Sequence, residues 1–259
     1  EEDTGKLFHL PSGESAVDYN RSGVPLMEIV TEFPPDMHTA EEARAYLQTL
    51  RSVLVYLGVC DGRMEQGSLR CEPNLSVRPK GSDTFGVKTE LKNLNSFRAV
   101  QRGIEYEIQR HIAVLESGGQ VVQETRGWND ERGESFPMRT KEYEQDYRYF
   151  PEPDLVPVQF TEGWIEQVRA SLPELPLAKR QRFMEQYALP EYDATLLVED
   201  RATADYFEEV VKLGAEPKAV ANWMNGDLAR LMNAAGIEDV RACKVQPKHL
   251  RDLIEMVQK

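Results

Sequence analysis

The sequence predicts an α+β protein in which an antiparallel sheet with its helices comes first and an all-α region follows. Over residues 68–92 polar and apolar side chains alternate with the period of two that β-strands require, in two runs joined by a turn. From residue 161 onward apolar residues recur only at helical spacing, with Pro or Gly between the segments. We therefore expect a first domain of residues 1–171 and a helical domain of residues 172–259.

The first predicted elements are a strand and an amphipathic helix. The apolar run Val24–Val30 is rich in branched residues and predicts a buried strand, with Glu28 in its middle. Thr39 and Glu42 then form a Thr-x-x-Glu capping box, and leucines at helical spacing follow until Gly58 ends the helix.

Two hairpins and a long helix complete the predicted first domain. The expected strands are residues 68–78, 87–92, 121–128 and 135–140, and a turn joins the members of each successive pair. Between the hairpins, Ser96 caps a helix whose apolar stripe runs from Val100 to Leu115 and which ends at Gly118. His111, on this helix, is expected to face solvent.

Composition excludes several classes of protein. The 259 residues are 41% hydrophobic and 29% charged, which suits a globular chain with room for two domains. No run approaches the roughly 18 apolar residues of a membrane span. The net charge of −13 disfavours nucleic acid as a partner on charge alone. Three cysteines without CxxC spacing suggest neither a disulfide framework nor a zinc ribbon, and we expect reduced thiols in the cell interior.

The chain begins with Glu1 and not Met. Its last helical pattern continues to Lys259 without a residue that would end a helix, so we expect an interior piece of a longer polypeptide. Neither the GxxxxGK[ST] nor the GxGxxG phosphate-binding pattern occurs.

The polar faces of the first predicted hairpin are the strongest functional signal. The ionisable and amide side chains on these two faces include Arg70, Glu72, Asn74, Lys88, Glu90 and Lys92. Carboxylates bind Mg²⁺, whereas Arg and Lys bind phosphate oxygens, so a sheet that presents both suits a reaction of ATP·Mg²⁺ without a P-loop. The alternative is an ordinary solvated sheet face.

Two further features have both a functional and a structural interpretation. Asn93 and Asn95 precede a helix N-terminus, which binds anions readily, although capping by Ser96 alone explains the pattern. Glu28 interrupts an apolar run, so it is either a site carboxylate or a side chain that points to solvent.

Several stretches of the first half resemble the B subunit of the bacterial-type aspartyl/glutamyl-tRNA amidotransferase, a tRNA-dependent heterotrimer. The matching stretches are EEDTGK, DYNRSGVPLMEIV, MEQGSLRCEPNLSVRP, TELKNLNSFRAV, GWNDERGE, MRTKE and DYRYFPEPDLVP, which cover most of residues 1–157 in order. LPEYDATLL and NWMNG extend the resemblance into the helical half.

The resemblance implies a fold and a reaction. The fold is an antiparallel-sheet cradle of the glutamine synthetase and guanido kinase type, then a helical domain; an N-terminal segment of the cradle and a C-terminal tail domain are expected to be absent. ATP phosphorylates the side-chain carboxylate of Glu or Asp on misacylated tRNA, and ammonia displaces the phosphate. The implied cofactors are ATP and Mg²⁺, the implied partners are the amidase A subunit, the small C subunit and the tRNA, and the expected location is the cytoplasm, or an organelle in a eukaryote.

Site residues follow from the family's motifs. Glu2 and Glu28 match its metal-binding carboxylates and are expected to be catalytic. Glu65, Glu72 and Glu90 are further candidates that bind a cation or line an ammonia channel, and of these Glu65 and Glu90 are also expected to be catalytic. The expected nucleotide contacts are Lys6, Arg70, Lys88, Lys92, Asn93 and Asn95. The chain departs from the family at Gln66, where a second glutamate is usual, and this shifts the expected carboxylate to Glu65.

Two other functions fit the residues. One is a tRNA-binding and assembly scaffold without catalysis, which the even spread of negative charge does not favour. The other is a small-molecule carboxylate kinase, which leaves the helical half without a purpose.

Overall fold

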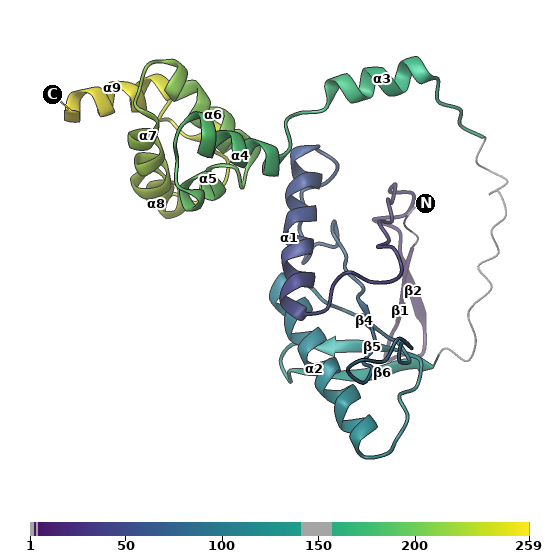
Figure 1. Ribbon diagram of the computed structural model, residues 1–259. Coiled ribbons are helices and arrows are strands. Elements are labelled where there is room, and N and C mark those ends of the chain that lie inside the picture. Colours follow the sequence, from purple (N-terminus) through teal and green to yellow (C-terminus); the bar gives the residue numbers. More distant parts are fainter. Residues whose placement is uncertain (1–2, 4, 141–156, 259) are drawn as a thin grey trace. The chain divides into compact units, whose positions relative to one another are not determined.

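The computed structural model describes residues 3, 5–140 and 157–258, and the chain forms two compact units, residues 1–38 and 39–259 (Figure 1). The predicted domain boundary between residues 171 and 172 stays a prediction. Within the second unit, one hydrophobic core lies between residues 40 and 128 and another between residues 183 and 254.

The first unit contains the antiparallel hairpin β1 (Lys6–His9) and β2 (Ser15–Asp18). The strand predicted at Val24–Val30 is wrong, because this run is irregular apart from a single bridge residue and is largely exposed. An apolar run forms a strand only where another strand supplies ladder hydrogen bonds, and the two strands described in this unit pair with each other.

Helix α1 (Ala40–Tyr56) opens the second unit and confirms the predicted capping box. The Thr39 hydroxyl accepts a hydrogen bond from the Glu42 N–H at 3.1 Å, and the Glu42 carboxylate accepts one from the Thr39 N–H at 3.0 Å. Gly58 follows the helix with φ of 71°, a conformation that glycine adopts without steric cost. The sequence therefore predicted both ends of this helix.

A four-stranded sheet lies at the centre of the second unit's first half. Its strands, in spatial order, are β3 (Asn74–Leu75), β4 (Thr89–Lys92), β5 (Glu124–Asn129) and β6 (Glu134–Thr140). The two predicted hairpins are confirmed, because β3 pairs antiparallel with β4 and β5 with β6. The central strands β4 and β5 run parallel, so the described sheet is mixed and the expectation of an antiparallel sheet holds for its two outer strand pairs but not for the central one. Helix α2 (Phe97–Glu116) carries the chain from the end of β4 back to the start of β5, and such a crossover makes two strands parallel.

Strand β3 is much shorter than the predicted run of residues 68–78. Pro73 lacks the N–H that a ladder needs, and β3 starts directly after it. The predicted alternation of burial survives outside the strand: Leu69 is buried, Arg70 is exposed, Cys71 is half-buried and Glu72 is exposed. The alternation in the sequence thus predicted correctly which side chains share a face. It overestimated how many residues of this segment pair with β4 in the sheet.

Helix α2 packs closely on one face of the sheet, which we call the inner face (Figure 1). Ser96 caps the helix by accepting a hydrogen bond from the Ala99 N–H at 3.0 Å, as predicted. Gly103 marks the closest approach, because a Cβ at this position would lie 3.0 Å from a methyl of Leu94 and 3.6 Å from the Trp128 ring. Burial of these apolar side chains attaches the helix to β4 and β5.

The described residues after position 157 are helical wherever they are regular, as expected. The helices are α3 (Glu162–Ser171), α4 (Pro176–Gln186), α5 (Glu191–Leu197), α6 (Arg201–Lys212), α7 (Pro217–Trp223), α8 (Ala229–Ala234) and α9 (Pro247–Gln258). Only the short α5 and a 3-10 turn at Val240–Ala242 were not predicted. A π-helical turn, Met224–Leu228, joins α7 to α8 within the segment predicted as a single helix.

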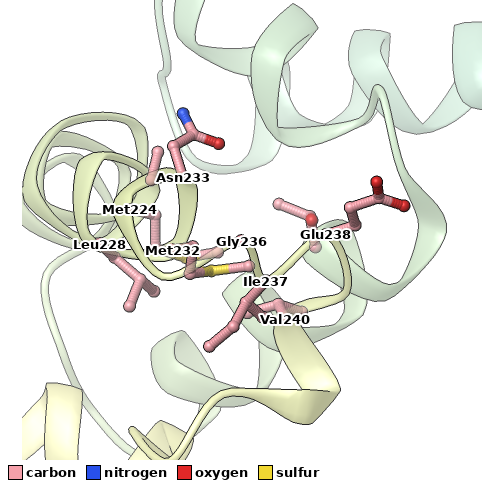
Figure 2. A pocket seen from close by; sticks show the side chains of 10 residues that line it. Met224, Leu228, Met232, Asn233, Gly236, Ile237, Glu238 and Val240 are labelled. Carbon is pink, nitrogen blue, oxygen red and sulfur yellow. The ribbon is translucent and has the colours of Figure 1, made fainter.

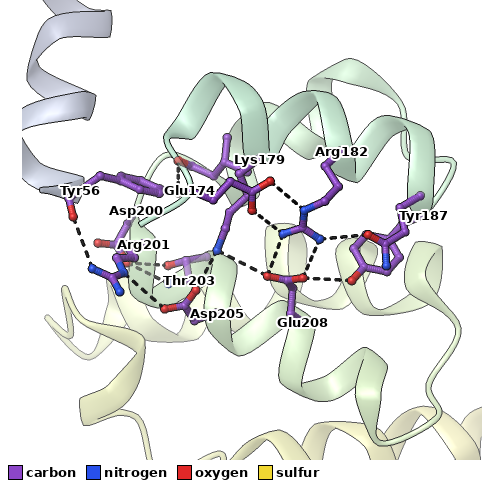
Figure 3. A network of polar contacts seen from close by, with 12 residues as sticks. Tyr56, Glu174, Lys179, Arg182, Tyr187, Asp200, Arg201, Thr203, Asp205 and Glu208 are labelled. Carbon is purple, nitrogen blue, oxygen red and sulfur yellow. Dashed lines mark hydrogen bonds and ion pairs between the residues drawn. The ribbon is translucent and has the colours of Figure 1, made fainter. Parts of the chain in front are cut away.

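Partly buried ion pairs connect α4 to α6 in the helical half (Figure 3). The Lys179 ammonium lies 2.8 Å from Asp205 and 3.4 Å from Glu208, and Arg182 donates to Glu208 at 2.8 Å. Tyr187 also donates to the Glu208 carboxylate, at 3.1 Å. These charges pair with one another in the described structure, so we assign them a structural role.

Tyr56, the last residue of α1, connects the two cores of the second unit. Its side chain is 1% exposed, and its hydroxyl donates to the Val198 carbonyl at 2.7 Å. In return, Arg201 donates to the Tyr56 carbonyl at 3.5 Å. None of the described helices is long and apolar enough to cross a membrane.

Candidate active site

The face of the sheet turned away from α2, which we call the outer face, brings polar side chains together. In the register of the parallel pair, Glu90 on β4 lies beside Thr125 on β5, and Lys92 lies beside Gly127. Asn74 on β3 lies opposite Glu90 on the other side. Because side chains alternate between faces along each strand, these residues all belong to the outer face.

Lys92 lies between two carboxylates of this face. Its ammonium is 2.7 Å from Glu72 Oε2 and 3.8 Å from Glu90 Oε1. The side chain of Glu72 is 44% exposed whereas that of Glu90 is only 13% exposed, so the Glu90 end of this group is the more sheltered from water. Shelter from water strengthens electrostatic interactions, which favours chemistry at Glu90.

The second oxygen of Glu90 is held by the neighbouring strand. The Thr125 hydroxyl donates to Glu90 Oε2 at 2.8 Å, and Thr125 is 1% exposed. Glu90 is therefore oriented at both oxygens, by Lys92 on its own strand and by Thr125 on β5.

Under the inner face, four charged side chains form a closed ring between α2 and β5. Glu107 pairs with Arg110 at 2.8 Å and with Arg126 at 3.2 Å. Glu124 completes the ring, 2.6 Å from Arg126 and 3.9 Å from Arg110. Two acids alternate with two bases, which is the arrangement that buried charges need.

The ring continues into a cluster of buried hydrogen-bonding groups around Glu107. The Ser135 hydroxyl donates to Glu107, and the Thr89 hydroxyl donates to it at 3.2 Å. Burial alone raises the pKa of Glu107, but hydrogen bonds from His111, Arg110 and Ser135 and the charge of Arg110 outweigh burial and hold this pKa well below its usual range.

The expectation that His111 faces solvent is wrong, because this side chain is completely buried. Its Nε2 lies 3.0 Å from the Thr89 hydroxyl and 3.5 Å from Glu107 Oε2. The physical reason is that the buried stripe of α2 passes through Val100, Ile104 and Glu107 to His111. These positions are spaced by 4, 3 and 4 residues along one helix face. That spacing was a signal in the sequence, but the polar partners of this cluster, Thr89 on β4, Arg126 on β5 and Ser135 on β6, are remote from it in the sequence.

The predicted site residues separate into three groups. Glu90 and Lys92 come together on the outer face with Glu72. Four further predicted residues are exposed in the second unit, namely Glu65, Arg70, Lys88 and Asn95. Glu28 is exposed in the first unit, Lys6 lies on β1, and Glu2 is outside the described residues.

Asn93 has a structural explanation. Its φ of 63° places it in the left-handed region, in the turn between β4 and α2. Asparagine tolerates this conformation better than most residues, so the turn by itself accounts for its presence.

The described residues do not by themselves form a site for Mg²⁺. Among them, no three His, Cys, Asp or Glu side chains lie close enough to hold a metal ion. At the pair of carboxylates formed by Glu72 and Glu90, the Lys92 ammonium takes the position of a cation. A site at this face would therefore need further ligands and displacement of Lys92.

The three cysteines are free thiols, as expected. Burial and the neighbouring Glu72 carboxylate raise the pKa of Cys71 to about 11, so this thiol is a poor nucleophile at neutral pH.

A pocket away from the outer face lies in the helical half (Figure 2). It is a pocket of about 380 Å³ lined by the π-helical turn, α8 and the segment that follows, with Met224, Leu228 and Met232 among its apolar walls. None of the predicted site residues lines it.

Comparison with known families identifies the class of protein to which this fold and face belong. The model described as "GatB/GatE catalytic domain" matches residues 1–166, and the model described as "GatB domain" matches residues 205–259. The outer face of the sheet thus lies within the segment that the "GatB/GatE catalytic domain" model matches. The chain belongs to the family of B subunits of aspartyl/glutamyl-tRNA(Asn/Gln) amidotransferase.

Two curated relatives with that name match this chain over 99% or more of its length. The protein of Thermodesulfovibrio yellowstonii is 54% identical over 259 residues, which are 100% of this chain and 54% of the relative. The protein of Moorella thermoacetica is 55% identical over 259 residues, 99% of this chain and 54% of the relative. The chain thus spans about half the length of the curated relatives it matches.

Proposed function

We propose that the protein to which this chain belongs converts Glu-tRNA(Gln) or Asp-tRNA(Asn) to the amide, as a subunit of a tRNA-dependent amidotransferase. The relatives are named for aspartyl/glutamyl-tRNA(Asn/Gln) amidotransferase, and the match to them covers the whole chain. The single observation that supports a catalytic role is Glu90, a sheltered carboxylate oriented at both oxygens within the segment that the catalytic-domain model matches.

The proposed chemistry needs an activated carboxyl group, because oxide and hydroxide leave poorly from a carboxylate. Transfer of a phosphoryl group from ATP makes an acyl phosphate. Ammonia then attacks its carbonyl carbon, the bond to the phosphate oxygen breaks, and the nitrogen gives up a proton that ends on the departing phosphate, so the products are the amide and inorganic phosphate. We assign Glu90 the acceptance of that proton, since an oriented carboxylate within hydrogen-bond reach of ammonia acts as a general base.

Lys92 has a matching role in this proposal. Its ammonium is held by Glu72 and Glu90, so a positive charge stays fixed at the outer face without a bound ligand. A fixed charge can stabilise the phosphate that leaves, because it does not need to reorganise during the reaction. Lys88 and Arg70, whose side chains are exposed, remain predicted contacts to phosphate.

ATP and Mg²⁺ stay the proposed cofactors, with Glu2 and Glu28 as the proposed metal ligands. Since the described residues do not form the ion's site, we derive no step through it. The proposed partners are an amidase A subunit that supplies ammonia, a small C subunit and the misacylated tRNA, and the proposed location is the cytoplasm, or an organelle in a eukaryote.

The experiment uses the full-length subunit in its assembled complex and measures the release of phosphate from ATP with and without misacylated tRNA. Phosphate release that depends on the misacylated tRNA, and its loss in Glu90→Gln while glutaminase activity continues, is the expected result. Glu105→Gln, which changes an exposed glutamate of α2, is the matched control and should behave as wild type.

Two outcomes would contradict the proposal. ATP turnover without tRNA would identify a small-molecule carboxylate kinase. Full activity of a complex whose B subunit carries both Glu90→Gln and Glu28→Ala would favour a scaffold without catalysis.

A further inference from the structure

Thr125 is a buried threonine whose hydroxyl points to a carboxylate of the candidate site. Its Oγ1 lies 2.8 Å from Glu90 Oε2, and only 1% of the residue is exposed. The two residues are register partners on parallel strands, so the contact is short and lateral. We infer that Thr125 is a positioning residue, which fixes the Glu90 carboxylate so that its other oxygen faces Lys92 and the outer face.

The hydroxyl is not needed for the strand itself. Valine has the same branched shape and an equal or better preference for strands. A buried hydroxyl has a desolvation cost that a methyl group avoids, unless the hydroxyl makes a hydrogen bond. The partner that offsets this cost at Thr125 is Glu90, which is why we connect the residue to the site.

The backbone beneath Thr125 is held from the opposite face. The pairing of β5 with β6 shifts register between Thr125 and Arg126, and such irregularities redirect side chains near active sites. Arg126, the next residue, enters the buried ring through Glu107 and Glu124. The ion pairs of the ring thus hold β5 on the inner face at Arg126, the residue next to Thr125. Thr125 in turn orients Glu90 on the outer face.

The inference rests on the proposed function only for its effect on the reaction. A general base must be held at the right angle to the proton that it accepts, and a freely rotating carboxylate meets this condition for a fraction of the time. We therefore expect Thr125→Val to lower kcat of tRNA-dependent amide formation roughly tenfold, about the effect of one hydrogen bond to a charged group, with little change in KM for ATP.

Two companion variants separate positioning from stability. Thr125→Ser keeps the hydroxyl and should keep kcat within about twofold of wild type, since the same bond forms. Thr89→Val removes a buried hydroxyl from the adjacent strand, on the inner face, where it bonds to Glu107 and His111. It should lower the melting temperature without the tenfold loss in kcat.

A double-mutant cycle tests whether Thr125 acts through Glu90. In the Glu90→Ala background, Thr125→Val should cause no further loss in the residual rate of amide formation, measured in single turnover at high enzyme concentration, because residues that act through one another are not additive. A full additional tenfold loss in that background would overturn the inference.

Crystal structures of full-length wild type and Thr125→Val provide a readout that does not depend on activity. The Glu90 carboxylate should leave its position or occupy several rotamers in the variant, while the backbone of β4 and β5 stays in place. An unchanged Glu90 side chain in Thr125→Val would overturn the inference. If the wild-type complex releases no phosphate in response to misacylated tRNA, the proposed function fails, and this comparison still decides the positioning role.

Discussion

Arg126 on β5 places its Nε 3.2 Å from Glu107 Oε1 on α2, in an ion pair whose carboxylate is completely buried. The guanidinium also donates to the Ser135 hydroxyl at 2.7 Å and to the Ser135 carbonyl at 3.0 Å. One side chain therefore ties a helix and two strands together underneath the candidate site.

Replacing Glu107 by Gln should destabilise the protein by about 3 kcal/mol, because the substitution leaves buried arginines with too little negative charge. Thermal and urea unfolding of the full-length protein measure this loss. Glu105→Gln, on the exposed side of the same helix, is the matched control and should change stability by less than about 0.5 kcal/mol. Equal stability of wild type and Glu107→Gln would mean that the ion pairs of the ring offset the desolvation cost of their own charges and add no net stability.

Stability should fall with acid in part through Glu208. Burial raises its pKa, but hydrogen bonds from Arg182 and Tyr187 and the charges of Arg182 and Lys179 prevail and lower it to about 2, from an ordinary value of 4.5. A depressed pKa stabilises the fold above pH 4.5, and this contribution disappears as the pH falls from 4.5 towards 2.

Urea unfolding at a series of pH values checks this dependence. Glu208→Gln should flatten the fall in stability below pH 4.5, whereas Glu209→Gln, its exposed neighbour on α6, should retain it. Identical pH profiles for the two variants would remove Glu208 as a source of acid sensitivity.

The Tyr56 hydroxyl should contribute measurably to the coupling of the two cores. Tyr56→Phe leaves the Val198 carbonyl without this donor in a buried position, at an expected cost of about 1–2 kcal/mol. The melting temperature and the rate of limited proteolysis report the change. Tyr46→Phe, on the same helix but with an exposed side chain, should leave both unaffected.

Gly127 should tolerate a methyl group only if Phe136 moves. A Cβ at Gly127 would lie 2.6 Å from Cζ of Phe136, which is closer than side chains pack. Because Phe136 is 43% exposed, its ring can swing aside, so we expect Gly127→Ala to cost only about 1 kcal/mol.

Adding Phe136→Ala to Gly127→Ala should recover part of that loss, and unfolding of the two single variants and the double variant measures the coupling. Gly163→Ala is the control, because its Cβ would meet nothing within 4 Å. Strict additivity of Gly127→Ala and Phe136→Ala would show that the ring does not obstruct the methyl group.

Features set by neighbouring residues in the sequence were predictable. The capping box of Thr39 and Glu42, the Ser96 cap and both hairpins need only local hydrogen bonds, and each is present. The alternation around Glu72 identified the correct face even where no strand forms.

Features that depend on remote partners were not predictable. The parallel pairing of β4 with β5 follows from where α2 returns the chain, and no local pattern encodes it. His111 was expected at the surface of its helix, yet its partners Thr89 and Glu107 provide a buried polar environment. Likewise, the polar face of the predicted strand identified Glu90 as a candidate. Its contact with Thr125 was not predictable, because the two residues are 35 positions apart in the sequence.

Because α2 connects β4 to β5, the geometry of the candidate site depends on the number of residues in this helix. Glu90 precedes the helix and Thr125 follows it, while Glu107 in its middle holds the strand that carries Thr125. Each residue of an α-helix turns the chain by about 100°, so inserting or deleting a single residue between Ser96 and Glu107 would rotate Glu107 away from Arg126. Length changes should therefore be tolerated in the turn at residues 79–86 and be harmful in the first three turns of α2.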